Sequence, residues 1–466
     1  MASIEKRGDN SYRITVCDGY DSQGTKIKKR KSVTLVPGLT TKQTEKELQR
    51  QAALFEDEVS KGTYIDAGKI TFGEFIERWL VDYGEKQLMP KTLYRYKEMI
   101  KFRIIPALGH IQLSKLQPTH LLEFYNNLEE KGIRLDTKYI ATNLFMDIIS
   151  KKQLKTKDLA NLFEINEKTV QRILKGKTTT LKIATRISNK LDLKLNTLFI
   201  PAGTPQKLSD TTILHHHRLI SIILNCAVYW QLLLINPANR VKSPKVEKKD
   251  VSFYDEDQTE NMLSLLENEP LKYKTMINIA VYGGMRLGEL AALEWSDINF
   301  DNCLLRIERA EQYIPNIGVF DKDPKNYSSK RVITIPESLI ELLKEYKVWQ
   351  NELRLKCGDQ WQDHNRLFTQ WNGKPIFPDT PSKWFKKFRE KNNLPEITFH
   401  QIRHTNASLL ISQGVDVSTV SSRLGHARTS TTTDIYSHAL KRADKTAAEK
   451  LEELFGKKKT NDKKSG

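Results

Sequence analysis

Residues 398–438 read TFHQIRHTNASLLISQGVDVSTVSSRLGHARTSTTTDIYSH, and this stretch decides how the rest of the chain is interpreted. His400 and Arg403 are three residues apart, so their side chains share one face if the segment is helical. A Leu-Gly-His sequence ends at His426, and Tyr436 follows ten residues later. Each of these pieces alone also fits an ordinary structural role. The stretch holds two more histidines that we expect to pack or form hydrogen bonds rather than react, His404 and His438.

Two segments further upstream add cationic side chains to this set. The segment Tyr282-Gly-Gly-Met-Arg-Leu-Gly-Glu-Leu290 follows an apolar helix, and its paired glycines let the backbone turn tightly before Arg286 opens the next helix. A guanidinium fork in that place suits a phosphate oxygen, although a lone arginine is more often a surface or ion-pair residue. Lys325 stands at a turn that leads into a strand ending near Ile335, where a lysine is usually only a solvated charge.

The order of these pieces, rather than any one of them, resembles the tyrosine recombinase family of the integrase type. The matching features are an Arg after Gly-Gly, a turn Lys, His-x-x-Arg-His, Leu-Gly-His and a Tyr ten residues later. Members of this family break and rejoin DNA through a 3′-phosphotyrosyl intermediate, without a metal ion or a nucleotide. The resemblance covers the whole chain and implies a DNA strand-exchange enzyme that needs no cofactor.

The resemblance also implies a role for most side chains of the set. Arg286 and Arg403 would clamp the scissile phosphate and His426 would add a hydrogen bond, because without a metal ion the protein must offset the charge of the transition state. Tyr436 would be the nucleophile. His400 would assist the loss of its proton, since a phenol with a pKa of about 10 is protonated at neutral pH.

The remaining role is that of the general acid, which gives a proton to the departing 5′ oxygen. Residues 325–331 read KNYSSKR and line up with the family pattern Lys-Thr-Lys-Ser-Ser-x-Arg, which assigns this role to Lys325. The strand that follows is two residues longer than usual, so Lys330 stays open as an alternative. Glu289 resembles the acidic residue that often follows the first Arg, and we expect it to orient neighbouring groups.

The composition agrees with a nucleic-acid partner. The 466-residue chain has 75 Lys and Arg against 57 Asp and Glu, a net charge of +18 that favours a polyanion. No apolar run approaches the roughly 18 residues of a membrane span, and residues 1–13 lack the apolar segment of a signal peptide. Four cysteines without metal or redox spacing indicate reduced thiols in a cytoplasmic protein. The resemblance implies that it acts in a bacterial cell or in association with the nucleoid. The run His215–His217 has no acidic or thiol partner, so we expect a helix face and no metal site.

The fold class expected is a multidomain α+β protein. Alternating and helical patterns predict a small N-terminal β-sheet with one helix, an all-α part in two pieces, and a mainly α C-terminal part with a small antiparallel sheet. The resemblance implies that the all-α part is a core-binding domain and that the C-terminal part is the catalytic domain. These domains occupy residues 1–65, residues 70–134 with 209–245, and residues 251–455. The charged, Pro-containing segment 242–249 is the clearest boundary, and we expect the polar tail 456–466 to be disordered.

The N-terminal part resembles an arm-type DNA-binding domain, because its second strand is very basic. Strands can enter a DNA groove. The four cations of this strand are therefore candidate DNA contacts, namely Lys28, Lys29, Arg30 and Lys31. The alternative is a basic strand that is only solvated.

Residues 136–206 interrupt the core-binding domain, where typical relatives have a short loop. The segment predicts a helix from Thr156 to Phe163, a turn, and a second helix from Glu167 to Leu174, which together resemble a helix-turn-helix module of the phage-repressor type. The side chains expected to face a DNA groove are Lys168, Thr169, Gln171 and Arg172. The alternative is a helical bundle that only packs or binds a partner.

These features favour a site-specific recombinase that integrates, and also excises, a mobile element. A recombinase that resolves chromosome dimers is the nearest alternative, and a DNA-binding transcriptional regulator is the alternative from another class. The expected partners are core-type and arm-type attachment sites in double-stranded DNA, a homotetramer on that DNA, and an accessory directionality or host DNA-bending factor, with no membrane. The C-terminal segment 441–455 either docks on a neighbouring subunit or packs on its own domain.

Overall fold

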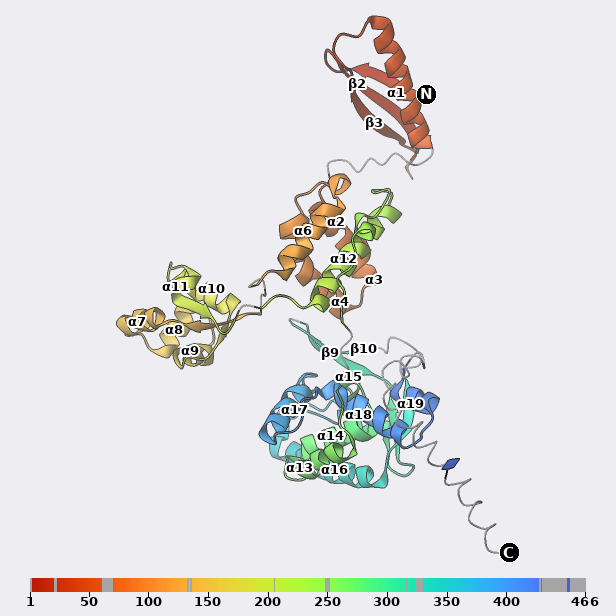
Figure 1. The fold of residues 1–466 in the computed structure, drawn as a ribbon. Helices are drawn as coiled ribbons and strands as arrows, with labels where there is room; N and C mark the ends of the chain where they lie inside the picture. The colour runs from red at the N-terminus through yellow and green to blue at the C-terminus, as the bar shows by residue number, and fades with distance from the viewer. Residues whose placement is uncertain are drawn as a thin grey trace, which may run out of the picture. The chain divides into compact units, whose positions relative to one another are not determined.

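The computed structural model describes residues 2–20, 23–60, 70–131, 134, 136–204, 206–247, 252–315, 317–322, 330–426, 429 and 451–452. Two of the predicted site residues, Lys325 and Tyr436, and the tail 456–466 lie outside these ranges. The chain divides into two compact units at Glu247 and Lys248, inside the linker that the sequence marked. The first unit contains three bodies with separate hydrophobic cores, and the second is built around one large core (Figure 1).

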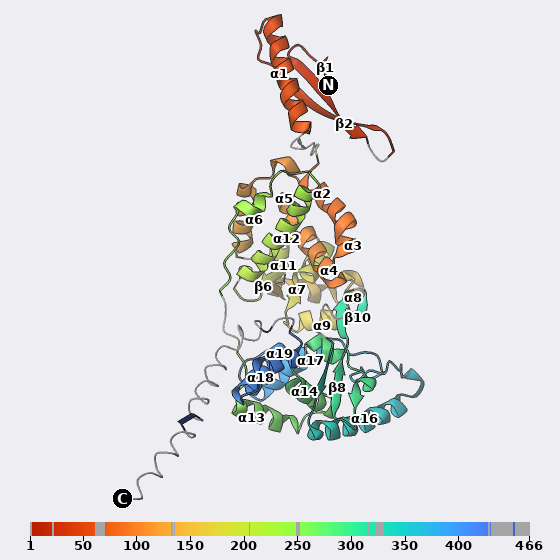
Figure 2. The same ribbon diagram turned by 90° about the vertical axis from the view of Figure 1, so that its right-hand side faces the viewer.

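The first body is a three-stranded antiparallel sheet with one helix on it. The strands β1 (Ser3–Lys6), β2 (Ser11–Tyr20) and β3 (Lys26–Thr34) pair in the order β1-β2-β3, and helix α1 (Thr41–Ser60) lies along one face (Figure 2). Ile14 and Val16 on β2 meet Phe55 and Val59 on α1 in a small core. Because side chains alternate along a strand, the other face of the sheet is left without a cover from this body.

The second body is a helical core assembled from two separate stretches of sequence. Its main helices are α2 (Phe72–Trp79), α4 (Pro90–Met99), α6 (Pro118–Glu129) and α12 (Asp210–Tyr229), with the short α3 (Glu85–Gln87) and α5 (Ile105–Leu108). Thr71 caps α2 in a capping box with Glu74, as its sequence position favours. Phe75, Trp79 and Ile220 are fully buried in the shared core, so the stretch before residue 131 and the stretch after residue 208 form one folding unit.

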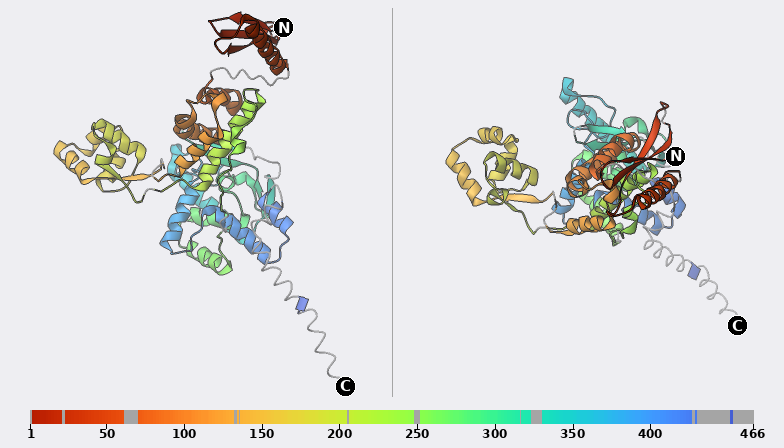
Figure 3. Two further views of the ribbon diagram at one scale, coloured as in Figure 1. Left: turned by 45° about the horizontal axis from the view of Figure 1, so that its top comes forward. Right: turned by 90° about the horizontal axis from the view of Figure 1, so that it is seen from above.

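The third body comprises the residues between these two stretches (Figure 3). It contains α7 (Asn143–Lys152), α8 (Thr156–Phe163), α9 (Glu167–Leu174), α10 (Leu181–Lys190) and α11 (Leu195–Leu198). A three-stranded sheet in the order β5-β4-β6 joins its ends, with β4 (Lys138–Ala141) between β5 (Thr179–Thr180) and β6 (Phe199–Pro201). The sequence did not predict this sheet, because strands of two to four residues are too short to show a period. It also did not predict α7.

The C-terminal unit is mainly helical around a large apolar core. Its helices are α13 (Glu256–Leu266), α14 (Leu271–Gly283), α15 (Leu287–Ala291), α16 (Glu337–Cys357), α17 (Thr380–Lys391), α18 (Phe399–Ser412) and α19 (Val417–Leu424). Three strands pair antiparallel in the order β11-β8-β7, namely β11 (Arg331–Thr334), β8 (Leu304–Ile307) and β7 (Ile298–Asn299). A separate hairpin joins β9 (Ala310–Ile314) to β10 (Gly318–Lys322).

The prediction of a mainly helical chain with small antiparallel sheets is confirmed. The predicted helices at 156–163 and 167–174 begin and end where the sequence placed them. Among the described helices, none combines the length and the apolar character needed to cross a bilayer.

Candidate active site

The position of Arg286 is set by a tight turn between two helices. Helix α14 is followed by the capping residue Gly284, which has a φ of 56° in the left-handed region that favours glycine. A Cβ added there would lie 2.6 Å from Leu424 and 2.7 Å from the side-chain oxygen of Asn406. Asn406 on α18 donates to the Val281 carbonyl at 2.7 Å and thereby satisfies the end of α14. The paired glycines of the sequence therefore let α14 and α18 approach closely, with Arg286 next to their contact.

The side chain of Arg286 is held by a buried carboxylate. Arg286 precedes α15, and its backbone N–H donates to Glu289 Oε2 at 3.0 Å while its Nη1 donates to Glu289 Oε1 at 2.8 Å. Its Nη2 donates to the carbonyl of Gly425 at 3.0 Å, on the segment that ends in His426. The Arg286 side chain is still 39% exposed. It is therefore oriented by the protein and yet open to a ligand from solution.

Helix α18 carries the second arginine and the histidine that precedes it. Arg403 is buried, and its Nη1 donates to the carbonyl of Gly284 at 2.8 Å, which ties α18 to the turn before Arg286. His400 lies one helical turn earlier on the same face, as the spacing predicted. The rings of His400 and His404 meet edge to face with centroids 5.2 Å apart. The latter contact agrees with the packing role expected for His404.

The electrostatics of the histidines show that these side chains form one cluster. The pKa of His426 is lowered to about 4, first by burial and then by the charges of Arg403 and Arg286. Burial followed by the same two arginines also lowers the pKa of His400. His400 has a solvent-exposed surface, but enough protein surrounds the ring to disfavour its charged form. Both imidazoles are therefore neutral at pH 7. In this form His400 can accept a proton, and His426 can donate a hydrogen bond from its N–H group.

The structure thus brings together four of the six predicted catalytic side chains. Arg286, His400, Arg403 and His426 come from the α14–α15 turn, α18 and the end of α19. Lys325 and Tyr436 lie outside the described residues, so the structure gives them no place. Lys330, the alternative to Lys325, is described and exposed.

Two arginines that the sequence did not single out reinforce this cluster. Arg331 at the start of β11 donates to Glu289 at 2.9 Å and to the Arg423 carbonyl at 2.7 Å. Arg423 donates to the carbonyls of Tyr282 and Thr334, both at 2.9 Å. The family pattern Lys-Thr-Lys-Ser-Ser-x-Arg aligned its last residue with Arg331 but gave it no role, and nothing in the sequence marked Arg423. Within the described residues, no group of three or more His, Cys, Asp or Glu side chains could hold a metal ion.

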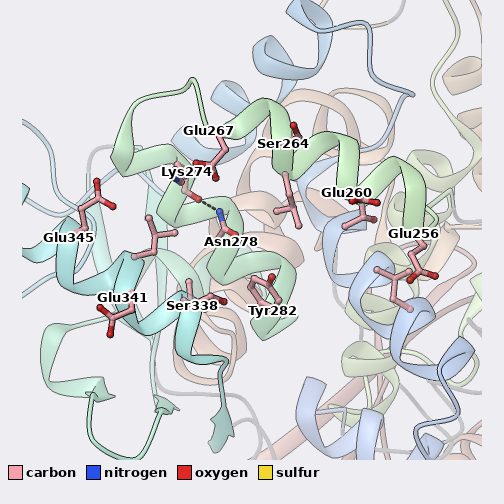
Figure 4. A pocket seen from close by; sticks show the side chains of 15 residues that line it. Glu256, Glu260, Ser264, Glu267, Lys274, Asn278, Tyr282, Ser338, Glu341 and Glu345 are labelled. Carbon is pink, nitrogen blue, oxygen red and sulfur yellow. Dashed lines mark hydrogen bonds and ion pairs between the residues drawn. The ribbon is translucent and has the colours of Figure 1, made fainter.

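A groove elsewhere in this unit has the opposite character. It occupies about 930 Å³ between α13, α14 and α16 (Figure 4). Five glutamates line it, namely Glu256, Glu260, Glu267, Glu341 and Glu345. Lys274 pairs with Glu267 at 2.6 Å and so offsets only part of this charge. An acidic lining repels a phosphate, so this groove is not part of the candidate site.

The predicted basic strand of the first body splits between two faces of its sheet. Lys29 and Lys31 lie on the face of α1, where Lys29 is 3.8 Å from Asp18 and Lys31 donates to Glu58 at 2.9 Å. Residues paired across strands share a face, so Lys28 beside Cys17 and Arg30 beside Thr15 lie on the face away from α1. The run of four cations therefore presents only its alternate members to the open face.

The predicted contact residues of the third body lie on α9. Val170 and Ile173 are buried in its core, whereas Lys168, Gln171 and Arg172 are exposed and Thr169 is half-buried. The turn before α9 has Glu164 in the left-handed region at φ 53°, with Ile165 N donating to Ala160 O at 3.0 Å. The two helices are thus held at a tight turn, with one exposed face of α9.

Comparisons with known proteins agree with the geometry of the cluster. Residues 252–443 match the model of the phage integrase family, and residues 71–128 match the phage integrase N-terminal SAM-like domain. The ICEBs1 integrase of Bacillus subtilis is 32% identical over 249 residues, which cover 53% of this chain and 67% of the relative. A XerC-like tyrosine recombinase of Caldanaerobacter subterraneus is 25% identical over 97% of this chain and 98% of its own.

The fold has a counterpart among solved structures. The Tn1549 transposon integrase in complex with a circular intermediate DNA superposes with a TM-score of 0.55 at 16% identity, over 82% of this chain and 99% of that chain. At this level of identity the likeness concerns the fold. Together with the matched family models, it leads to one conclusion. The chain belongs to the phage integrase family and is a tyrosine recombinase, an enzyme that cleaves and rejoins DNA.

Proposed function

We propose that this recombinase integrates a mobile element into DNA at specific sites and excises it again, with Arg286 and Arg403 holding the scissile phosphate. The observation that carries the proposal is the convergence of Arg286, His400, Arg403 and His426 from three segments far apart in the chain. Two guanidinium groups supply positive charge where a phosphate in transition gains negative charge. His426 adds a hydrogen bond to the same phosphate.

The remaining steps use Tyr436 and Lys325, whose roles the sequence motifs imply. Tyr436 attacks the phosphorus and forms a 3′-phosphotyrosyl bond, while His400, neutral at pH 7, takes up its proton. Lys325 protonates the departing 5′ oxygen. The phosphotyrosyl bond conserves the energy of the phosphodiester, so the 5′ hydroxyl of a partner strand can attack it without ATP.

The proposal is tested with DNA from both sides of the gene. A direct repeat found there is placed on a supercoiled circle and on a linear duplex, and both are incubated with the protein in EDTA without a nucleotide. We expect hybrid junctions at the repeat. Binding without joined strands would favour a transcriptional regulator, and activity confined to two sites on one circle would favour dimer resolution.

An altered leaving group on the DNA distinguishes Lys325 from Lys330 as the general acid. We expect Lys325→Ala to slow cleavage about hundredfold, because the 5′ alkoxide then leaves without a proton. Sulfur in place of the bridging 5′ oxygen should restore the rate, because a thiolate needs no general acid. Lys330→Ala is the matched control and should stay within about threefold of the parent rate. The reverse pattern in single-turnover cleavage would assign the acid to Lys330.

We also propose that residues 1–65 bind arm-type DNA through the face of the sheet away from α1. Lys28 and Arg30 lie on that face, whereas Lys29 and Lys31 approach carboxylates on the other. The double variant Lys28→Ala/Arg30→Ala should reduce the salt-dependence slope of arm-site binding by about two, one for each lost phosphate contact. The double variant Lys29→Ala/Lys31→Ala removes the same charge and should leave the slope unchanged. Equal slopes for the two variants in a salt titration would contradict the assignment.

We further propose that residues 136–206 form an inserted helix-turn-helix module that reads DNA through α9. The ends of the module meet, since Arg134 donates to Gln206 at 2.9 Å and β4 pairs with β6, as a module inserted into another domain requires. Its residues carry thirteen Lys and Arg against six Asp and Glu, a net charge of +7. Within the described part of the chain, neither Lys168 nor Arg172 forms an ion pair. An exposed helix with such a face fits the major groove.

A footprint tests this module against a purely packing role. Lys168→Ala/Arg172→Ala should remove a separate protected segment of DNA and weaken binding to it about tenfold or more. The control Lys151→Ala/Lys152→Ala changes the same charge at the exposed end of α7 and should leave the footprint intact. If neither the α9 variant nor deletion of 136–206 changes the footprint, the module does not contact DNA, and it is a helical bundle that only packs or binds a partner.

For the assembly we propose a homotetramer that holds two core-type sites, aided by an accessory directionality or host DNA-bending factor. The Tn1549 integrase was solved on a circular intermediate DNA, which supports DNA as the ligand of this fold. The segment 441–455 would dock on a neighbouring subunit. Its deletion should then lower the mass of the protein–DNA complex in solution, whereas a segment that packs on its own domain would leave that mass unchanged.

A further inference from the structure

Arg331 joins the three segments that carry the phosphate-binding side chains. It begins β11, and its side chain is only 7% exposed. Its Nη2 donates to Glu289 Oε2 at 2.9 Å, on the helix that Arg286 precedes. Its Nε donates to the Arg423 carbonyl at 2.7 Å, two residues before Gly425, whose carbonyl accepts from Arg286. One buried cation thus contacts both the helix behind Arg286 and the segment that leads to His426.

We propose that Arg331 is a positioning residue that keeps the charge and the orientation of Arg286 available to the scissile phosphate. This inference rests on the proposed role of Arg286 in binding that phosphate. Arg331 does not touch the phosphate itself. It acts by neutralising Glu289, so that the buried carboxylate does not use up the charge of Arg286.

The charge balance around Glu289 supports this role. The carboxylate is 6% exposed and accepts hydrogen bonds from both Arg286 and Arg331. Burial works to raise the pKa of Glu289, but the charge and hydrogen bond of Arg331, ahead of those of Arg286, hold it below the usual value. The three side chains together carry one net positive charge. Without Arg331 the remaining pair is neutral, and of the two described cations that hydrogen-bond this carboxylate only Arg286 is left to balance it.

The shape of the arginine side chain is also needed. Nε and Nη2 of Arg331 point to acceptors on two different segments, the Glu289 carboxylate and the Arg423 carbonyl. A planar guanidinium offers such diverging donors in a fixed geometry, whereas a lysine has one ammonium group at the end of a flexible stem. Arg331→Lys is therefore expected to retain the charge but to lose the fixed spacing of the segments.

The test compares Arg331→Met with a second change that restores the charge balance. Arg331→Met should slow single-turnover cleavage about hundredfold through misplacement of Arg286, with DNA binding nearly unchanged. The double variant Arg331→Met/Glu289→Gln removes the unbalanced carboxylate and should recover about tenfold of that loss. Arg331→Lys keeps a buried cation and serves as the second variant if Arg331→Met does not fold. Its cleavage rate should lie between the rates of Arg331→Met and of the parent protein. The control Arg306→Met, on the exposed side of β8, should cleave at the parent rate.

A double-mutant cycle separates this role from general structural damage. In an Arg286→Ala background, Arg331→Met should lower the cleavage rate by a further factor of less than about five, because Arg331 acts through Arg286. A further hundredfold loss there, or no recovery in the double variant with Glu289→Gln, would overturn the positioning role. If the parent protein and Arg286→Ala cleave equally, the proposed function itself is wrong.

Discussion

Tyr436→Phe should abolish the covalent protein–DNA adduct while it leaves DNA binding intact. The substitution removes one oxygen, which is the atom that would bond to phosphorus. The guanidinium groups of Arg286 and Arg403 stay protonated and cannot attack, and His400 and His426 have other roles, in proton transfer and in a hydrogen bond to the phosphate. Loss of a nucleophile lowers the rate by at least about 10⁴-fold. The adduct should therefore fall below detection on a denaturing gel with a nicked half-site substrate.

The matched control removes a phenolic oxygen at a different place. Tyr229 is 83% exposed at the end of α12, so Tyr229→Phe should form the adduct at the parent rate. The dissociation constant for the half-site should change by less than about twofold in both variants, because a single hydroxyl group contributes little to binding that is dominated by phosphate contacts. An adduct that persists in Tyr436→Phe would mean that another residue is the nucleophile. Peptide mapping of that adduct would then identify it.

The sequence was informative wherever a local spacing determines a local geometry. His400 and Arg403 share a face because three residues separate them on a helix, and the paired glycines before Arg286 predicted the turn at Gly284. The order of the motifs supplied the family. All of these features can be read within a few residues of one another or from their order along the chain.

Contacts between distant segments were beyond such reasoning. Arg331 meets Glu289 across 42 residues and the Arg423 carbonyl across 92, and no periodic pattern encodes either contact. In the first body, the run from Lys28 to Lys31 looked like one basic strand. Its division between the two faces of the sheet depends on which face α1 covers, and this is a tertiary choice. The carboxylate of Glu58 that meets Lys31 comes from a helix 27 residues away.

Arg403→Lys should lower the rate of cleavage about 10³-fold, or about 4 kcal/mol of transition-state stabilisation. Arg403 is buried, and one of its five N–H donors already holds the Gly284 carbonyl at 2.8 Å. A guanidinium can keep that contact and still present donors to a phosphate, whereas a lysine ammonium at the same depth must give up one of the two partners. The charge is retained in this variant, so a large loss would show that geometry, and not charge alone, is required.

The control is Arg389→Lys, at a buried arginine on α17 that lies 3.4 Å from Glu396, and this variant should cleave normally. If Arg403→Lys keeps more than about a tenth of the parent single-turnover rate, the clamp on the phosphate does not depend on the guanidinium fork, and the role of Arg403 is confined to supporting the turn before Arg286.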